Sequence, residues 1–173
     1  LCPVLLGDKI SRIFLYDLRP IDKTSIDFVP QDKVVVAENW QQAYVDTDVF
    51  ITATVSKAPY IDKPPKKGSL QLNISLRDYK TDMFDYVKDS IIVDNWEEIC
   101  REKTDIEMMH LEKGLQMEQT KSIIDMVVDH CMKDYPPEAP IMFNPMGMAV
   151  FDMAVGAYYF KEAQKKGIGQ ELV

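Results

Sequence analysis

The sequence predicts an α/β protein built on a parallel sheet with flanking helices. Short, nearly continuous apolar segments alternate with amphipathic stretches, which is typical of buried parallel strands joined by crossover helices. Acidic and hydroxyl side chains stand where several of these segments end. With 173 residues, of which 46% are hydrophobic, the chain is large enough for one domain with a sizeable core.

Six segments have the composition of strands. Each is short, apolar and bounded by polar or turn-forming residues. The predicted strands are residues 13–18, 34–37, 49–54, 70–75, 90–94 and 141–143.

Helices are predicted between and after these strands. Asn39 can cap a short helix over 39–45, and Asn95 can cap another that runs to Cys100. Residues 120–132 carry an apolar stripe at helical spacing, which predicts a longer helix. The last helix is expected over 148–165 with Gly167 as its stop, and its broad apolar surface suggests contacts beyond the sheet.

Charge, hydropathy and cysteine usage disfavour several classes of protein. The net charge of -8 argues against a nucleic-acid partner. Apolar runs fall short of the roughly 18–20 residues that span a bilayer, so a membrane partner is not expected. Cys2, Cys100 and Cys131 are widely spaced, which favours a reducing, cytoplasmic setting and argues against a metal site.

The acid at the end of the first predicted strand is the first candidate for chemistry. In a dinucleotide-binding fold, an acid there receives ribose hydroxyls, roughly twenty residues after a glycine-rich turn. Asp17 has this place, but the only nearby glycine is Gly7. Either Asp17 is a solvated loop acid, or the chain starts inside a nucleotide-binding domain whose glycine-rich loop and first strand are missing.

Polar residues also follow other predicted strands. Thr52 and Thr54 end the third strand, although threonine is common in strands in any case. Asp78 follows the fourth, where a carboxylate could act as a general base or hold a substrate ammonium group. A loop acid paired with Arg77 or Lys80 is the alternative. Ligands of open α/β sheets bind beyond the carboxyl ends of the strands, so these residues are candidates for a binding edge.

The turn over 143–147 joins the last strand to the last helix. Unpaired N–H groups at a helix N-terminus bind anionic or polar groups, but a plain strand–helix turn is the alternative.

Three segments, in order, resemble the ornithine cyclodeaminase/μ-crystallin family. They are residues 48–54 with Pro59, residues 73–78 (Asn-Ile-Ser-Leu-Arg-Asp), and residues 143–152, which begin Phe-Asn-Pro-Met-Gly-Met-Ala. The resemblance covers nearly the whole chain, as the C-terminal half of that family. Within the family, the sequence is most similar to dehydrogenases that form 2,3-diaminopropionate in siderophore biosynthesis of the staphyloferrin B type.

The resemblance implies a Rossmann-like domain that binds NAD and a hydride transfer at a C–N bond of an amino-acid-type substrate. It also implies a separate substrate domain that forms a homodimer. Asp78 matches the catalytic acid of the family, and Asp17 matches its ribose-binding acid. The remaining predicted cofactor-binding residues are Thr52, Thr54, Asn73, Ser75, Pro145 and Gly147.

The run after Asp78 bears on the substrate. Cyclodeaminases continue with a Pro-Gly-Lys-Thr/Ser-like run, whereas this chain has Tyr79 to Asp82, which disfavours ornithine cyclisation. The siderophore-type reaction would oxidise N-(2-amino-2-carboxyethyl)-L-glutamate to 2-oxoglutarate and 2,3-diaminopropionate. Ornithine cyclodeaminase or a related alanine/imine reductase is one alternative. A crystallin-like ligand-binding protein without turnover is the other.

The domain organisation follows from the same resemblance. Residues 1–147 are predicted to be a truncated NAD-binding Rossmann-like domain. Residues 148–173 are predicted to be a C-terminal helix that returns toward the missing substrate and dimerisation domain. The chain by itself is therefore expected to show little or no turnover.

Overall fold

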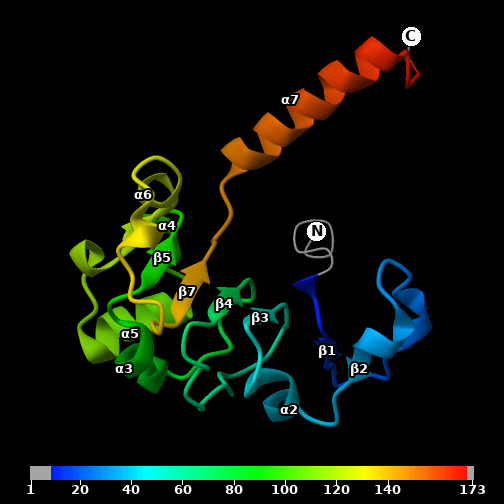
Figure 1. The fold of residues 1–173 in the computed structure, drawn as a ribbon. Helices are drawn as coiled ribbons and strands as arrows, with labels where there is room; N and C mark the ends of the chain where they lie inside the picture. Colours follow the sequence, from blue (N-terminus) through cyan, green and yellow to red (C-terminus); the bar gives the residue numbers. More distant parts are fainter. Residues whose placement is uncertain (1–8, 171–173) are drawn as a thin grey trace.

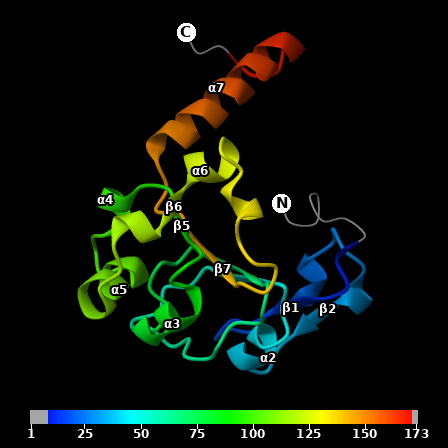
Figure 2. The same ribbon diagram turned by 60° about the vertical axis from the view of Figure 1, so that its left-hand side comes forward.

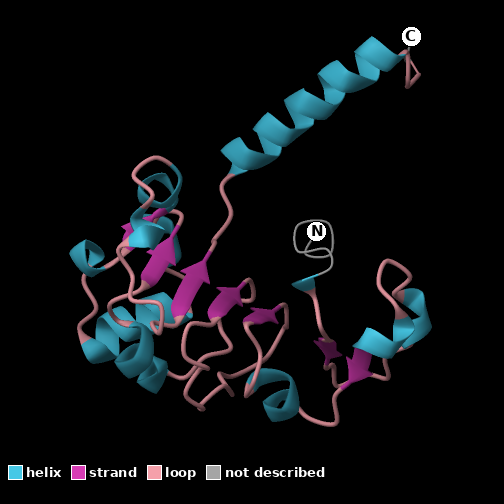
Figure 3. Ribbon diagram, viewed as in Figure 1, coloured by secondary structure: helices cyan, strands magenta, loops and turns pink. Residues whose placement is uncertain are grey.

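The computed structural model describes residues 9–170, so Cys2 and Gly7 lie outside the described residues. Parallel strands form a sheet in the order β3-β4-β7-β5-β6, and helices pack against it (Figure 1; Figure 3). The predicted α/β fold with a parallel, Rossmann-like sheet is confirmed. The strands are β1 (Ile13–Leu15), β2 (Val34–Val36), β3 (Val49–Thr52), β4 (Leu70–Asn73), β5 (Ile91–Val93), β6 (Lys121–Ser122) and β7 (Ile141–Asn144). The helices are α2 (Trp40–Tyr44), α3 (Phe84–Val87), α4 (Trp96–Ile99), α5 (Asp105–Lys113), α6 (Ile123–Val127) and α7 (Ala149–Lys166).

The first two strands form a small sheet of their own. β1 and β2 run in parallel with Ile13 opposite Val34, and neither strand is hydrogen-bonded to β3. Figure 1 shows this pair beyond the β3 edge of the larger sheet. Phe14 packs against the hydrophobic core, which links β1 to the rest of the domain. The structure thus divides the expected single sheet into two.

The larger sheet buries one face more completely than the other. Phe50 and Met142 both lie opposite Gln71 in the strand register and so share a face, which is covered by α2, α3 and α5. The opposite face carries a row of three neighbouring side chains, Ile51, Leu72 and Phe143. Ile51 is exposed and the other two are half-buried. One apolar row of the sheet is therefore incompletely covered by the described residues.

Helix caps explain where the short helices begin and end. The predicted caps are confirmed: the side-chain oxygen of Asn39 accepts from Gln42 N, and that of Asn95 accepts from Glu98 N, each at 2.9 Å. The last helix also has its predicted end, because Gly167 has a φ of 62° and caps the final turn.

The helix predicted over 120–132 is wrong in its extent. The α-helix in this stretch is α6 alone, because Ser122, at the end of β6, and Asp125 form a capping box that starts the helix at Ile123. His130 then adopts a left-handed conformation with a φ of 55°, which a continuing α-helix does not allow. Ile124 and Val127, members of the predicted apolar stripe, are exposed.

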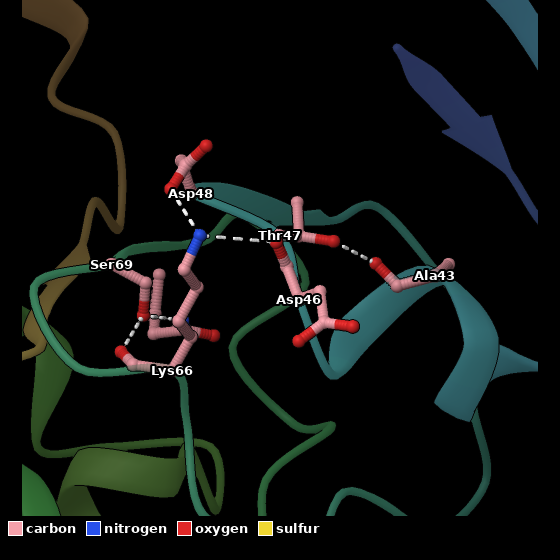
Figure 4. A network of polar contacts seen from close by, with 7 residues as sticks. Ala43, Asp46, Thr47, Asp48, Lys66 and Ser69 are labelled. Carbon is pink, nitrogen blue, oxygen red and sulfur yellow. Dashed lines mark hydrogen bonds and ion pairs between the residues drawn. The ribbon is translucent and has the colours of Figure 1, made fainter. Parts of the chain in front are cut away.

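A polar cluster fixes the amino ends of β3 and β4. Lys66 Nζ donates a hydrogen bond to the backbone oxygen of Asp46 at 3.2 Å and to the carboxylate of Asp48 at 2.5 Å (Figure 4). Ser69 donates to the Lys66 carbonyl at 2.6 Å in the same view. Leu70 N donates to Asp48 O at 2.8 Å, which sets the register of the two strands. These contacts lie at the amino ends of the strands, opposite the carboxyl edge of the sheet, where ligands of such sheets bind.

The last helix extends away from the sheet. α7 leaves the carboxyl end of β7, and both views show it projecting beyond the other elements (Figure 1; Figure 2). Its large apolar side chains are exposed rather than packed, among them Met153, Tyr158 and Phe160. Within residues 9–170, none of the helices combines the length and the apolar character needed to cross a membrane.

Candidate active site at the carboxyl edge of the sheet

A row of polar side chains crosses three neighbouring strands where they end. Thr52 closes β3, Asn73 closes β4 and Asn144 closes β7, and all three are buried on the helix-covered face. The Thr52 hydroxyl donates to Asn73 Oδ1 at 3.1 Å, and Asn73 Nδ2 donates to Asn144 Oδ1 at 2.8 Å. Because buried polar groups are costly without partners, this row fixes the rotamer of each member.

The Asn73 side chain also shapes the turn that follows β4. Its Oδ1 accepts from Leu76 N at 3.0 Å, and Leu76 has a φ of 63°. A left-handed leucine costs roughly 1–2 kcal/mol, so the turn persists because its hydrogen bonds offset that strain. Strained residues of this kind gather at functional sites, and this one lies two residues before Asp78.

Asp105 is hydrogen-bonded to the backbone of the same turn. This residue begins α5, directly after the helix cap Thr104, and it is 2% exposed. Its Oδ2 accepts from Asn73 Nδ2 at 2.9 Å, from Asp78 N at 3.1 Å and from Tyr79 N at 3.2 Å. In return, Asp105 N donates to Leu76 O at 2.7 Å.

The carboxylate of Asp78 lies between two hydroxyl groups. Thr54 Oγ1 donates to Asp78 Oδ1 at 2.6 Å, and Ser75 Oγ donates to Asp78 Oδ2 at 2.5 Å. Hydrogen bonds to the charged form of a carboxylate stabilise that form. Asp78 is 0% exposed, whereas Thr54 is exposed and Ser75 is half-buried. The two hydroxyls therefore connect an enclosed carboxylate with the surface of the edge.

Tyr60 contacts the backbone of Asp78 from the loop after β3. Tyr60 N and Ile61 N donate to the Asp78 carbonyl at 2.9 and 2.8 Å, which places the loop after β3 against the turn after β4. Burial raises the pKa of the Tyr60 hydroxyl to about 12, and the negative charge of Asp78 adds to the rise. Tyr60 therefore stays a neutral hydrogen-bonding group beside the carboxylate at ordinary pH.

Asp17 lies apart, after the end of β1. Its Oδ1 accepts from Arg19 N at 2.7 Å and from Arg19 Nε at 3.3 Å, and both residues are exposed. These hydrogen bonds lower the pKa of Asp17, so it is ionised at neutral pH.

The turn into α7 is tied to a neighbouring strand end. Gly147 has a φ of 87°, and its N–H donates at 2.8 Å to Oδ2 of Asp94, which follows β5. Pro145 is half-buried in the same turn. A cavity of about 260 Å³ beside it is lined by Asp94, Trp96, Asp125 and neighbouring residues.

The structure brings together most of the predicted site residues. Thr52, Thr54, Asn73, Ser75 and Asp78 form one continuous hydrogen-bonded group.

Asp17, Pro145 and Gly147 stand at other strand ends, where Asp17 is hydrogen-bonded to Arg19 and Gly147 to Asp94. The assignment of all these residues to catalysis or cofactor binding stays a prediction. In the part of the chain that the structure describes, no cluster of three or more His, Cys, Asp or Glu residues is placed to hold a metal ion.

Sequence reasoning missed Asp105 and Asp94 as members of the site. The signal available for Asp94 was its place directly after a strand, which is shared by Asp17. For Asp105, the pattern Thr104-Asp105 indicates only a helix start, since its burial depends on contacts with residues about thirty positions earlier in the chain.

The chain is similar in sequence to a known dehydrogenase. The chain is 30% identical, over 177 aligned residues and 95% of its length, to N-((2S)-2-amino-2-carboxyethyl)-L-glutamate dehydrogenase from Staphylococcus aureus. The resemblance to this type of dehydrogenase that the sequence predicts is thereby confirmed. The chain spans 51% of that relative, about half its length. No protein-family model matches the chain.

Solved structures share the fold over nearly the whole chain. CmnK superposes with a TM-score of 0.77 at 22% identity, covering 98% of this chain and 53% of CmnK. A Δ(1)-pyrroline-2-carboxylate reductase from Thermococcus litoralis, in complex with NADH and L-proline, gives 0.72 at 17% identity, with coverages of 92% and 52%. An archaeal alanine dehydrogenase dimer with bound NAD gives 0.71 at 21% identity, with coverages of 95% and 53%.

The buried acid in this site predicts a pH-dependent contribution to stability. Burial raises the pKa of Asp105 to about 6 from 3.8, against the opposing hydrogen bonds from Tyr79, Asn73 and Asp78. The folded chain therefore holds this proton more tightly than the unfolded chain does. The resulting stabilisation is complete below about pH 4 and is lost as the pH rises through about 6. We expect the free energy of unfolding of Asp105→Asn to rise relative to wild type by on the order of 2 kcal/mol across this window.

Urea denaturation of both proteins at a series of pH values measures this difference. Asp62→Asn is the matched control, because the hydrogen bond from Lys80 lowers the pKa of Asp62 and the pH-dependent difference should have the opposite sign. A difference between Asp105→Asn and wild type that stays constant with pH would contradict the expectation.

Proposed function

We propose that the chain is the cofactor-binding part of an NAD-dependent dehydrogenase that acts on a C–N bond of an amino-acid-type substrate. The observation that carries this proposal is the Asp78 carboxylate, held between the Thr54 and Ser75 hydroxyls at the carboxyl edge of a parallel sheet. The similarity to a dehydrogenase of N-(2-amino-2-carboxyethyl)-L-glutamate favours that substrate and its products, 2,3-diaminopropionate and 2-oxoglutarate.

The polar edge and Asp17 fit a dinucleotide. Ligands of open α/β sheets lie beyond the carboxyl ends of the strands, and an acid after a strand can accept both ribose hydroxyls. The hydrogen bonds that Asp17 makes within the protein use Oδ1, and its charge would repel a 2′-phosphate. Bound NAD would supply the acceptor for a hydride from the carbon next to the substrate nitrogen.

Asp78 provides the proton chemistry in this proposal. Oxidation of a secondary amine releases a proton from nitrogen as the hydride leaves carbon, and a positioned carboxylate accelerates such a transfer. The exposed Thr54 hydroxyl, 2.6 Å from Asp78 Oδ1, offers the substrate nitrogen a route to the enclosed carboxylate. Asp78 can return this proton to the imine nitrogen and then, as a carboxylate again, assist the attack of water on the carbon, which separates the two products.

We propose in addition that residues 1–147 belong to the cofactor-binding domain and that 148–173 extend toward a substrate and dimerisation domain. The exposed apolar side chains of α7 support this, as does the incompletely covered row of Ile51, Leu72 and Phe143. Exposed apolar patches of this kind mark protein–protein contacts. The complete protein is accordingly proposed to be a homodimer, and the 173-residue chain alone is expected to show little turnover.

Replacement of the proposed acid–base residue should abolish most of the activity. In the complete encoded protein, we expect Asp78→Asn to lower kcat by roughly 10²–10⁴-fold, because the amide cannot accept the substrate proton. NADH formation from N-(2-amino-2-carboxyethyl)-L-glutamate measures this, and ornithine and alanine are run beside it to separate the related activities.

Asp62→Asn serves as the control for Asp78→Asn. Asp62 is an exposed acid in the neighbouring loop, paired with Lys80 at 2.9 Å, and its loss should leave kcat within about twofold of wild type, because exposed ion pairs contribute little. Full turnover by Asp78→Asn would show that Asp78 has no part in the proton transfer.

Asp17 should set the cofactor preference. Asp17→Ala removes a charged hydrogen-bond acceptor, so we expect the KM for NAD to rise by about tenfold or more and the preference for NAD over NADP to fall. Steady-state kinetics with both cofactors test this. Asp32→Ala, at an exposed acid just before β2, should change neither value. An unchanged preference in Asp17→Ala would refute the ribose-binding role.

A further inference from the structure

We infer that Asp105, which lies under the catalytic turn and outside any proposed contact with substrate, is a positioning residue that sets the direction of the Asp78 carboxylate. This inference rests on the proposed function, because it assigns Asp105 a role in the proton transfer by Asp78. The role is exerted through the backbone of residues 76–79 and the side chain of Asn73.

The contacts of Asp105 concentrate on the catalytic turn. One carboxylate oxygen, Oδ2, accepts the N–H groups of both Asp78 and Tyr79. The backbone N–H of Asp105 holds the carbonyl of Leu76, two residues before Asp78. The first residue of α5 therefore contacts the turn on both sides of the position that carries the proposed acid.

The Asn73 amide connects Asp105 to the hydroxyl group of Thr52 and to the backbone of the turn. Asp105 Oδ2 accepts from Asn73 Nδ2 at 2.9 Å, and Asn73 Oδ1 in turn accepts from the Thr52 hydroxyl and from Leu76 N. Ser75, whose hydroxyl donates to Asp78, also donates its backbone N–H to Thr52 O at 3.2 Å. Loss of Asp105 thus leaves three buried N–H donors without their acceptor and frees the turn to move.

Without the Asp105 carboxylate, the turn keeps its hydrogen bonds to the loop after β3 and the two bonds of Leu76, to Asn73 Oδ1 and to the backbone N–H of Asp105. Tyr60 N and Ile61 N donate to the Asp78 carbonyl, and Lys80 N donates to Ile61 O at 2.9 Å. These bonds keep the turn attached to the loop after β3, so the turn is expected to tilt without Asp105 rather than to unfold. A displacement of about 1 Å at a reacting group costs about 10²-fold in rate, because proton transfer depends steeply on alignment.

Because all three N–H groups are bonded to the same carboxylate oxygen, Asp105 has a conservative replacement that keeps an oxygen in that place. In Asp105→Asn, the amide oxygen can take the place of Oδ2 and accept the same three N–H groups. Asp105→Ala removes the acceptor altogether. Asp105→Ser is a second variant whose shorter side chain fails to reach the turn while it keeps a polar residue at the start of α5.

Kinetics of the complete protein test the inference. We expect Asp105→Ala and Asp105→Ser to lower kcat by about 10–100-fold, with the KM for NAD within about threefold of wild type. Asp105→Asn should retain kcat to within about fivefold. Active sites are counted by NADH titration, so a loss of folded protein does not enter kcat. In an Asp78→Asn background, Asp105→Ala should have no further effect on the residual rate.

Thr104→Ala is the matched control. Thr104 is 0% exposed, precedes Asp105 and caps α5 by accepting from Glu107 N, and its hydroxyl donates to Ile99 O rather than to the Asp78 turn. Its loss weakens the same helix start and should leave kcat unchanged. A similar fall of kcat in Thr104→Ala, or an equal effect of Asp105→Ala in the Asp78→Asn background, would overturn the inference.

Amide hydrogen exchange separates this inference from the proposed function. The N–H groups of Asp78 and Tyr79 should exchange faster in Asp105→Ala than in Thr104→Ala, whatever reaction the protein catalyses. Wild-type exchange rates at these two amides in Asp105→Ala would refute the positioning role. Turnover that survives in Asp78→Asn would refute the proposed function while leaving the exchange result to decide on Asp105.

Discussion

One buried carboxylate oxygen, Oδ2 of Asp105, accepts three N–H groups beneath the carboxyl edge of the sheet. Burial of a charge is costly unless its hydrogen-bonding capacity is used, and a satisfied polar group of this kind specifies one arrangement of its neighbours. Here the neighbours are the end of β4, through Asn73, and the turn that carries Asp78. The geometry of the candidate site therefore depends on the position of α5, an element that contributes nothing to the sheet itself.

The two parts of the candidate site are held in very different ways. Asp78 is enclosed, with both carboxylate oxygens bonded to hydroxyls and the backbone bonded on two sides. Asp17 is exposed and, among the described residues, hydrogen-bonded to Arg19, two residues along the chain. A rigid acid suits proton transfer, which depends on alignment, whereas an exposed acid remains open to a ligand. This division supports the proposal that Asp78 serves the chemistry and that Asp17 serves the cofactor.

Strands and helix caps could be predicted because each is signalled by a few consecutive residues. Continuous apolar segments predict β3, β4 and β7. Asn39, Asn95 and Gly167 also act as the predicted caps. The same approach overextended α6, since an apolar stripe does not reveal that His130 turns left-handed. It also missed α5, whose inward side chains Ile106 and Met109 are too few to stand out among its charged residues.

The candidate site could be predicted only in part. The rule that ligands bind at the carboxyl ends of strands pointed to Thr54 and Asp78, and the family resemblance added Ser75; these three side chains do meet. Burial of Asp105 and its contact with Asn73 depend on the packing of α5 beneath β4, which a single sequence does not reveal.

A crystal structure of the complete protein with NADH and N-(2-amino-2-carboxyethyl)-L-glutamate would test the central claim most directly. The measurement is the distance from the substrate secondary nitrogen to Thr54 Oγ1 and Asp78 Oδ1. The proposed function predicts hydrogen-bond contact, about 2.6–3.2 Å, with at least one of these oxygens. A substrate nitrogen held elsewhere, with Asp78 still enclosed between Thr54 and Ser75, would contradict it.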